Sequence, residues 1–252
     1  MDKEDIYTNF GYRKVESEQK QNLVKDLFSK VSTKYDLMNN LMSLGIHNLW
    51  KDLMIAELPN INAKLIDVAG GTGDIAFRFY NKVQEKHIQP NIIVADINPE
   101  MLQVCKDKAI NKNILSGIDF IECNAENLPF EDNSFDYYTI SFGIRNVTNI
   151  NSVLKEAYRI LRPCGKFICL EFSKINIPIL ERFYKTYSFH IVPLIGRFVA
   201  SNEEAYKYLV ESIDLFPEQN LFKSMIQDNE FSHVKYKNLS FGIASIHTAY
   251  KI

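Results

Sequence analysis

The chain has 252 residues, 46% of them hydrophobic, which suits one α/β domain with a sizeable core and excludes a disordered or fibrous protein. Its 29 lysine and arginine residues are balanced by 31 aspartate and glutamate residues, so we expect no nucleic-acid partner. The four cysteines form no CxxC pair, no apolar run approaches membrane-spanning length, and the acidic N-terminus is unlike a secretory signal, so a cytoplasmic protein is expected.

Two helical patterns precede the first strand. Residues 17–31 carry apolar side chains at helical spacing, and a second apolar set runs from residue 37 to residue 58, so we interpret residues 1–62 as a helical cap. From Lys64 the pattern changes to short apolar runs separated by helical stretches, which predicts a mostly parallel sheet. The expected strands of this core, residues 63–173, are 65–69, 92–97, 118–123, 135–143 and 166–173.

The segment 174–231 interrupts this alternation. It is rich in aromatic residues, contains helical patterns around 203–216 and 219–229, and is interpreted as an inserted helical lid over the substrate. Two last strands, near 233–239 and 242–250, are close enough in sequence to form an antiparallel hairpin within residues 232–252. We therefore expect a single domain.

The most informative motif is the glycine-rich stretch 67–74, which lies where a buried strand gives way to a helix. Glycines at 70, 71 and 73 permit a sharp turn and a close approach of the backbone to a ligand. Ordinary tight turns also use glycine, and the run from Gly71 to Ala76 also fits a dinucleotide fingerprint. The motif indicates a ligand site without naming the ligand.

Charge separates the two cofactors that such a loop binds. A pyrophosphate prefers neutral or basic surroundings, whereas Asp67 and Asp74 place carboxylates at both ends of the loop. S-adenosylmethionine (SAM) carries an ammonium and a sulfonium, so these carboxylates favour SAM over NAD. The alternative for Asp74 is a helix-start residue without contact to a ligand.

Later strand ends extend the expected cofactor site. Asp96 follows the second core strand, where an acidic residue accepts hydrogen bonds from ribose hydroxyls. It could instead cap the helix that opens at Pro99, although Asn98 is also available for that role. After the third strand, Asn124 and the Ala125 backbone are placed to bond an adenine edge without adding charge.

Together these residues resemble class I SAM-dependent methyltransferases, and within them the ubiquinone/menaquinone biosynthesis C-methyltransferases. The resemblance covers nearly the whole chain and rests on residues 35–51, 67–79, 124–130, 139–148, 170–173, 206–213 and 242–247. It implies a Rossmann-like, doubly wound, mostly parallel seven-stranded sheet. It also implies a C-methyltransferase that uses SAM, with S-adenosylhomocysteine as product and no metal, and that methylates a polyprenyl benzoquinol or naphthoquinol.

The resemblance also assigns individual residues. Besides Gly71 in the loop, the residues expected to contact SAM are Thr72, Asp96, Asn124, Ala125 and Ser141, and those expected to face the quinol are Tyr35, Arg145 and Asn146. Two positions depart from the family pattern: Cys164 stands where glycine is usual in a turn, and Phe241 where a small residue is common. These departures bear on turn geometry and not on the reaction.

Methylation of an aromatic carbon requires an electron-rich ring and stabilisation of negative charge on a quinol oxygen. Arg145 is the candidate phenolate stabiliser, with a salt bridge at the strand end as its alternative. Asn146 could orient a ring oxygen or a water, and Tyr35 could contact the acceptor or only pack within a helix.

The acceptor also suggests partners and location. A polyprenyl quinol stays in the bilayer, so we expect transient contact with the inner membrane surface through the aromatic and basic segment 174–197, for which burial in a helix pair is the alternative. A quinone-biosynthesis complex and a homodimer are further expected associations. An NAD-linked oxidoreductase and an inactive SAM-binding scaffold are the competing functions. The histidines show no metal-ligand spacing.

Overall fold

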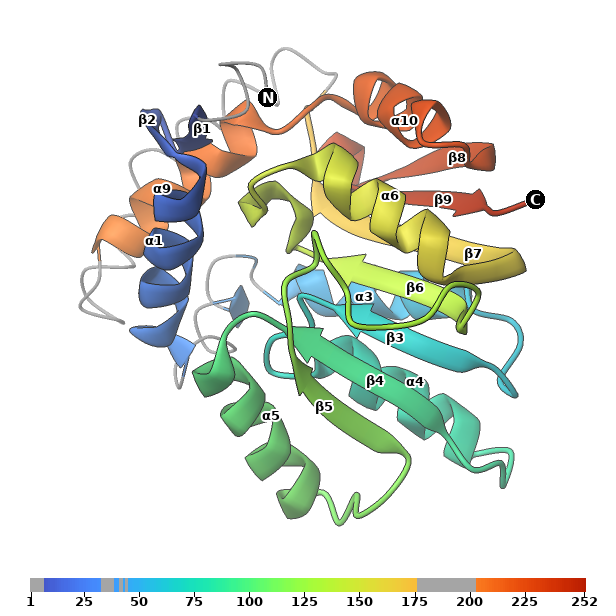
Figure 1. Cartoon of the computed structure of the whole chain (residues 1–252). Coiled ribbons are helices and arrows are strands. Elements are labelled where there is room, and N and C mark those ends of the chain that lie inside the picture. The colour runs from blue at the N-terminus through green and yellow to red at the C-terminus, as the bar shows by residue number, and fades with distance from the viewer. Residues whose placement is uncertain (1–6, 33–38, 41–42, 44, 176–202) are drawn as a thin grey trace.

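The computed structural model describes residues 7–32, 39–40, 43, 45–175 and 203–252 (Figure 1). Among the described helices, none is long and apolar enough to cross a bilayer. The expected substrate contact Tyr35 and nearly all of the expected membrane segment 174–197 lie outside the described residues.

A seven-stranded sheet organises the chain. Its order is β5-β4-β3-β6-β7-β9-β8, and the first five strands in this order are parallel, whereas β9 runs antiparallel to both β7 and β8. The strands are β3 Lys64–Val68, β4 Asn91–Asp96, β5 Ile118–Glu122, β6 Phe135–Ser141, β7 Leu161–Phe172, β8 Ser232–Leu239 and β9 Ala244–Tyr250. The expected mostly parallel, doubly wound sheet with a C-terminal hairpin is confirmed.

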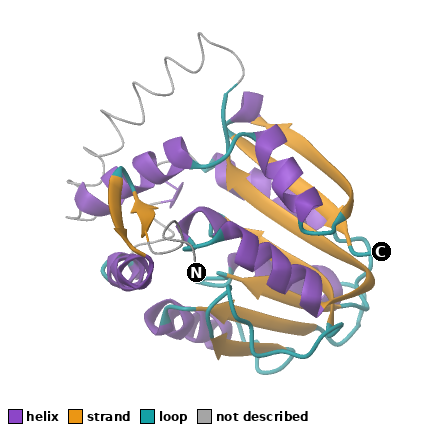
Figure 2. Ribbon diagram, turned by 45° about the horizontal axis from the view of Figure 1, so that its top comes forward, coloured by secondary structure: helices purple, strands orange, loops and turns teal. Residues whose placement is uncertain are grey.

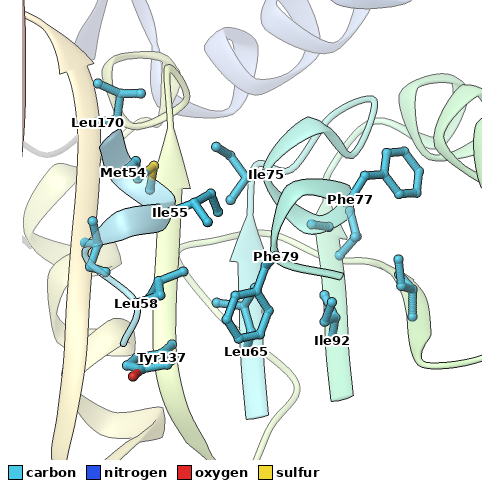
Figure 3. Packing of buried hydrophobic residues seen from close by; sticks show 14 of the residues in the cluster. Met54, Ile55, Leu58, Leu65, Ile75, Phe77, Phe79, Ile92, Tyr137 and Leu170 are labelled. Carbon is cyan, nitrogen blue, oxygen red and sulfur yellow. The ribbon is translucent and has the colours of Figure 1, made fainter. Parts of the chain in front are cut away.

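Helices cover both faces of this sheet. On one face lie α3 Ile46–Ala56, α4 Asp74–Gln84 and α5 Pro99–Asn111, and on the other lie α6 Ile150–Ile160 and α10 Gln219–Asp228. Met54 of α3 and Phe79 of α4 pack with Leu65 of β3, all of them fully buried (Figure 3). Helices α3 and α10, expected in the cap and in the lid, instead pack against the sheet, because their apolar faces contribute to its two cores.

A smaller group of elements stands beside the sheet (Figure 2). It consists of β1 Tyr7–Phe10, β2 Arg13–Glu16, α1 Ser17–Ser29 and α9 Glu203–Leu215, which share an apolar cluster of their own. The antiparallel β1–β2 pair was not expected from the sequence. The group faces the carboxyl-terminal ends of the parallel strands, the edge at which open α/β sheets bind ligands (Figure 1).

Candidate functional site

The glycine-rich turn joins β3 to α4 in a backbone conformation that favours glycine. Gly71 and Gly73 have φ of 55° and 84°, in the left-handed region. A Cβ on Gly73 would lie 2.3 Å from the Cys105 sulfur, whereas a Cβ on Gly71 would meet no atom within 4 Å. Gly73 thus allows the turn to pack on α5, and Gly71 lies where the backbone borders open space.

A second turn, after β6, packs against the first. Ala69 and Phe142 both have positive φ, 49° and 54°, although neither is glycine. A Cβ on Gly143 would lie only 2.5 Å from the Ala69 Cβ, so this close contact needs glycine at 143. Non-glycine residues held in left-handed conformations occur often at functional sites. The two turns form the floor of one pocket.

This pocket lies at the carboxyl-terminal edge of the sheet and is bordered by five segments of the chain, 21–28, 68–71, 96–101, 123–126 and 142–148. Its empty volume is about 790 Å³, open solvent included. The residues that line it are Gln21, Val24, Lys25, Phe28, Val68, Ala69, Gly71, Asp96, Ile97, Asn98, Met101, Cys123, Asn124, Ala125, Glu126, Phe142, Gly143, Asn146, Val147 and Thr148. Five of the expected site residues are therefore brought together here: Gly71, Asp96, Asn124, Ala125 and Asn146.

Asp96 is the acidic side chain at the end of β4. Its Oδ2 accepts the Gly71 backbone N–H at 2.8 Å, and its Oδ1 accepts the Asn98 N–H at 2.9 Å. Burial raises the pKa of the Asp96 carboxyl above its ordinary value, while these backbone donors oppose the shift. A carboxylate has about four lone-pair sites, so each oxygen retains acceptor capacity toward the pocket.

The helix cap beside Asp96 is Asn98. The Asn98 side chain accepts the Met101 N–H at 3.0 Å at the start of α5. This excludes the alternative role of Asp96 as the cap of that helix. Asn124 shapes the neighbouring turn, because its Oδ1 accepts the Glu126 N–H at 2.9 Å.

Thr72 and Ser141, two further residues expected to contact the cofactor, lie outside the set of described lining residues. Thr72 is buried, with 4% of its surface exposed. The Ser141 hydroxyl is buried and forms no hydrogen bond with the described part of the chain. Both residues stand next to the pocket, one in the glycine turn and one at the end of β6.

Arg145 and Asn146 belong to the short helical turn η3 Ile144–Asn146 and face different surroundings. Asn146 lines the pocket, and its Oδ1 accepts a hydrogen bond of 3.1 Å from the Tyr208 hydroxyl of α9. Arg145 instead donates to the Phe142 carbonyl at 2.6 Å and to Glu171 Oε1 at 2.8 Å. The strand-end salt bridge considered for Arg145 is thus present, and Arg145 borders an adjacent polar cavity together with Tyr208.

The two carboxylates at the ends of the glycine loop, Asp67 and Asp74, are not among the residues that line the pocket. Asp74 is paired with Lys51 at 2.6 Å and with Arg78 at 2.8 Å, and these cations lower its pKa against the effect of burial. Asp67 accepts a hydrogen bond from Thr139, and burial raises its pKa to about 7. Asp74 therefore joins α4 to α3, and the aspartate that borders the pocket is Asp96.

One wall of the pocket was missed by sequence reasoning. Gln21, Val24, Lys25 and Phe28 all come from α1. The helix itself was predicted at 17–31 and is observed at Ser17–Ser29, but its helical pattern did not reveal what its inner face covers. In the described parts of the chain, no group of three or more His, Cys, Asp or Glu side chains could hold a metal ion.

Comparisons with known sequences agree on one family. The model of the ubiE/COQ5 methyltransferase family matches residues 14–251. The Ubiquinone/menaquinone biosynthesis C-methyltransferase UbiE of Rickettsia prowazekii is 57% identical over 245 residues, which cover 97% of this chain and 99% of that relative. Among solved structures, a SAM-dependent methyltransferase of Thermotoga maritima has a TM-score of 0.61 at 19% identity and covers 91% of this chain and 100% of its own.

A third similar protein was solved with the cofactor. Phosphoethanolamine N-methyltransferase 2 of Haemonchus contortus, in complex with S-adenosyl-L-methionine, has a TM-score of 0.53 at 14% identity. The match covers 75% of this chain and 48% of that one. At such identities these structures establish the fold alone, which is that of SAM-dependent methyltransferases.

Proposed function

The chain belongs to the ubiE/COQ5 methyltransferase family, and on that premise we propose that it is the C-methyltransferase of ubiquinone and/or menaquinone biosynthesis in its cell. It transfers a methyl group from SAM to a ring carbon of a polyprenyl benzoquinol or naphthoquinol. The observation that carries this proposal is the 57% identity to a UbiE protein along almost the whole of both chains. The NAD-linked oxidoreductase and the inactive scaffold gain no support from the comparisons.

The described pocket fits SAM. Asp96 keeps lone pairs for two ribose hydroxyls, and the Asn124 side chain and the Ala125 backbone lie further along the same pocket. The apolar walls formed by Val24, Phe28 and Met101 suit an adenosine. When bound, the cofactor supplies a sulfonium-activated methyl group.

The chain's own residues orient the acceptor and manage its charge. A carbon–carbon bond forms between the ring carbon and the methyl group as the methyl–sulfur bond breaks, with its electron pair left on the thioether sulfur. The ring carbon then loses its proton to water. The bond to Glu171 fixes the Arg145 guanidinium next to the cofactor pocket, and its cation is proposed to favour an ionised quinol oxygen. Asn146, fixed by the Tyr208 hydroxyl, orients a ring oxygen or that water. Tyr35 is proposed to contact the acceptor.

Because the acceptor has a long isoprenoid tail, the enzyme is proposed to reach it at a membrane surface. We propose reversible contact with the inner membrane by the segment 174–197, which contains both aromatic and basic side chains. Glutamate at Arg182 and Lys185 would then weaken binding to anionic vesicles while short-tailed quinols are still methylated. Association with other quinone-pathway proteins or with a second copy of the chain is proposed on the same basis.

The quinones of cells that lack this protein test the proposed function. Mass spectrometry should find a ubiquinone or menaquinone precursor one ring methyl short, and the wild-type gene should restore the mature quinone. The Asp96→Asn variant serves as a matched control that should restore much less. A normal quinone profile in the deleted cells would contradict the proposal.

A further inference from the structure

Helix α1 spans the cofactor pocket between two anchors. At its C-terminal end, the Asn98 side-chain amide donates to the Lys25 carbonyl at 2.9 Å and to the Ser29 hydroxyl at 3.0 Å. Ser29 in turn donates to Glu100 at 2.9 Å. This end of α1 is therefore fixed to the start of α5, beside the Asp96 side of the pocket.

The other anchor is a buried lysine. The ammonium of Lys20 donates to the Val147 carbonyl at 2.7 Å, and only 5% of the Lys20 surface is exposed. Val147 lines the cofactor pocket and directly follows Asn146. The N-terminal half of α1 is thus joined to the turn after β6, a different segment of the pocket lining from the one that contains Asn98.

The wall residues lie between or beside these anchors. Gln21, Val24 and Phe28 project into the pocket from the length of helix that the two contacts hold. Their position depends on how closely α1 approaches the sheet edge. The apolar side of α1, including Val24 and Leu27, packs against β1, β2 and α9, whereas Glu18 and Asn22 are exposed. The Lys20 ammonium is what ties this half of the helix to the turn after β6.

An apolar side chain could fill the volume of Lys20 without the cost of burying an amine. Burial lowers the Lys20 pKa to about 8, and Glu126 is the charged group that opposes this shift. The other ionisable groups around its cavity are Arg145 of η3 and Tyr208 of α9. The Lys20 amine donates to a carbonyl that lines the pocket, so its role is better explained by positioning α1 than by filling space in a core.

We propose that Lys20 is a positioning residue for cofactor binding, which holds α1 against the pocket through the Val147 carbonyl. When this contact is lost, the N-terminal half of α1 moves away from the pocket and the cofactor dissociates faster. The inference rests on the proposed function, because it takes SAM as the ligand of the pocket.

Stopped-flow measurement of SAM dissociation tests this role. Lys20→Met removes the donor and should speed dissociation about tenfold, as expected for the loss of one hydrogen bond from a charged group. The KM for SAM should rise by a similar factor, while kcat at saturating SAM changes little. Lys20→Arg keeps a donor and should recover most of the wild-type rate. Lys30→Met, an exposed lysine at the end of the same helix, should behave as wild type.

A well-folded Lys20→Met variant with wild-type SAM dissociation would overturn the proposal, as would an Arg variant that is no better than Met. Hydrogen exchange on the wild-type protein gives a second test that needs no variant. SAM should slow exchange across 20–29 of α1 more than in β6, and equal exchange in α1 with and without SAM would contradict the inference. Failure of wild-type protein to bind SAM would instead refute the proposed function.

Discussion

Arg145 and Glu171 form an ion pair of 2.8 Å that is almost completely buried, with 3% and 1% of their side chains exposed. Burial raises the pKa of the Glu171 carboxyl, while the Arg145 guanidinium opposes that shift. The pair joins the turn after β6 to the end of β7. It therefore fixes the short helical turn to which both Arg145 and Asn146 belong. Arg145 therefore has a structural role in addition to the proposed chemical one.

Replacing both partners separates these two roles. Arg145→Ala alone should lower the free energy of unfolding by about 3–5 kcal/mol, because it leaves Glu171 buried and unpaired. The double variant Arg145→Met with Glu171→Gln should regain most of that stability. Its kcat should still be about 10²-fold below wild type, with SAM affinity nearly unchanged. If a stable double variant turned over at the wild-type rate, Arg145 would have no role in the reaction.

Asp96 should control cofactor affinity. Asp96→Asn replaces one acceptor oxygen by a donor, which disturbs the bonds from Gly71 and Asn98 and weakens those to ribose hydroxyls. We expect SAM binding to weaken by about 2–4 kcal/mol in calorimetry. Asp119→Asn, an exposed carboxylate on β5, is the matched control. Equal affinities of the two variants would exclude Asp96 from the cofactor site.

Asp67 should make stability depend on pH. Its pKa is raised from 3.8 to about 7 in the folded protein, so the folded state binds a proton that the unfolded state lacks between those values. The free energy of unfolding therefore falls as pH rises from about 4 to about 7, and above that range the whole destabilising effect of Asp67 is present. Urea unfolding should show Asp67→Asn gaining stability relative to wild type at higher pH. Parallel pH profiles would show that Asp67 is ionised throughout.

Cys164 occupies a backbone position that favours glycine. Its φ is 67°, which agrees with the glycine that the family resemblance leads one to expect there. Cys164→Gly should raise the free energy of unfolding by about 1 kcal/mol, because glycine adopts this conformation without steric cost. Cys164→Ala keeps the Cβ and should bring no such gain. A stabilising alanine variant would point to the sulfur and not to the backbone.

The sheet could be predicted because its strands are continuous apolar runs, as in β3 and β4, bounded by turn residues. The β1–β2 hairpin could not, since its short strands are mostly exposed and leave no buried alternation. It is held by distant contacts: Phe10 stacks on Tyr208 with ring centroids 4.4 Å apart, and the Tyr12 N–H donates to Glu211. The only local sequence feature that indicates this hairpin is the two-residue turn that begins at Gly11.

The candidate site was predictable where residues follow strand ends. Asp96 and Asn124 could be placed by that rule, because parallel strands end at one edge of the sheet. The partner of Asp74 could not, because Lys51 approaches it only after α3 docks on α4. The pocket wall formed by α1 could not be predicted either, because a helical pattern does not reveal which element the inner face of the helix contacts.

Transfer of a labelled methyl group tests the central claim most directly. Purified protein would be incubated with SAM carrying a deuterated methyl group and with short-tailed benzoquinol and naphthoquinol acceptors that lack one ring methyl. We predict that mass spectrometry and NMR will find the intact labelled methyl on the ring carbon of at least one acceptor, with S-adenosylhomocysteine formed in equal amount. Label on a ring oxygen, or no transfer by protein that binds SAM, would contradict the assignment as a quinol C-methyltransferase.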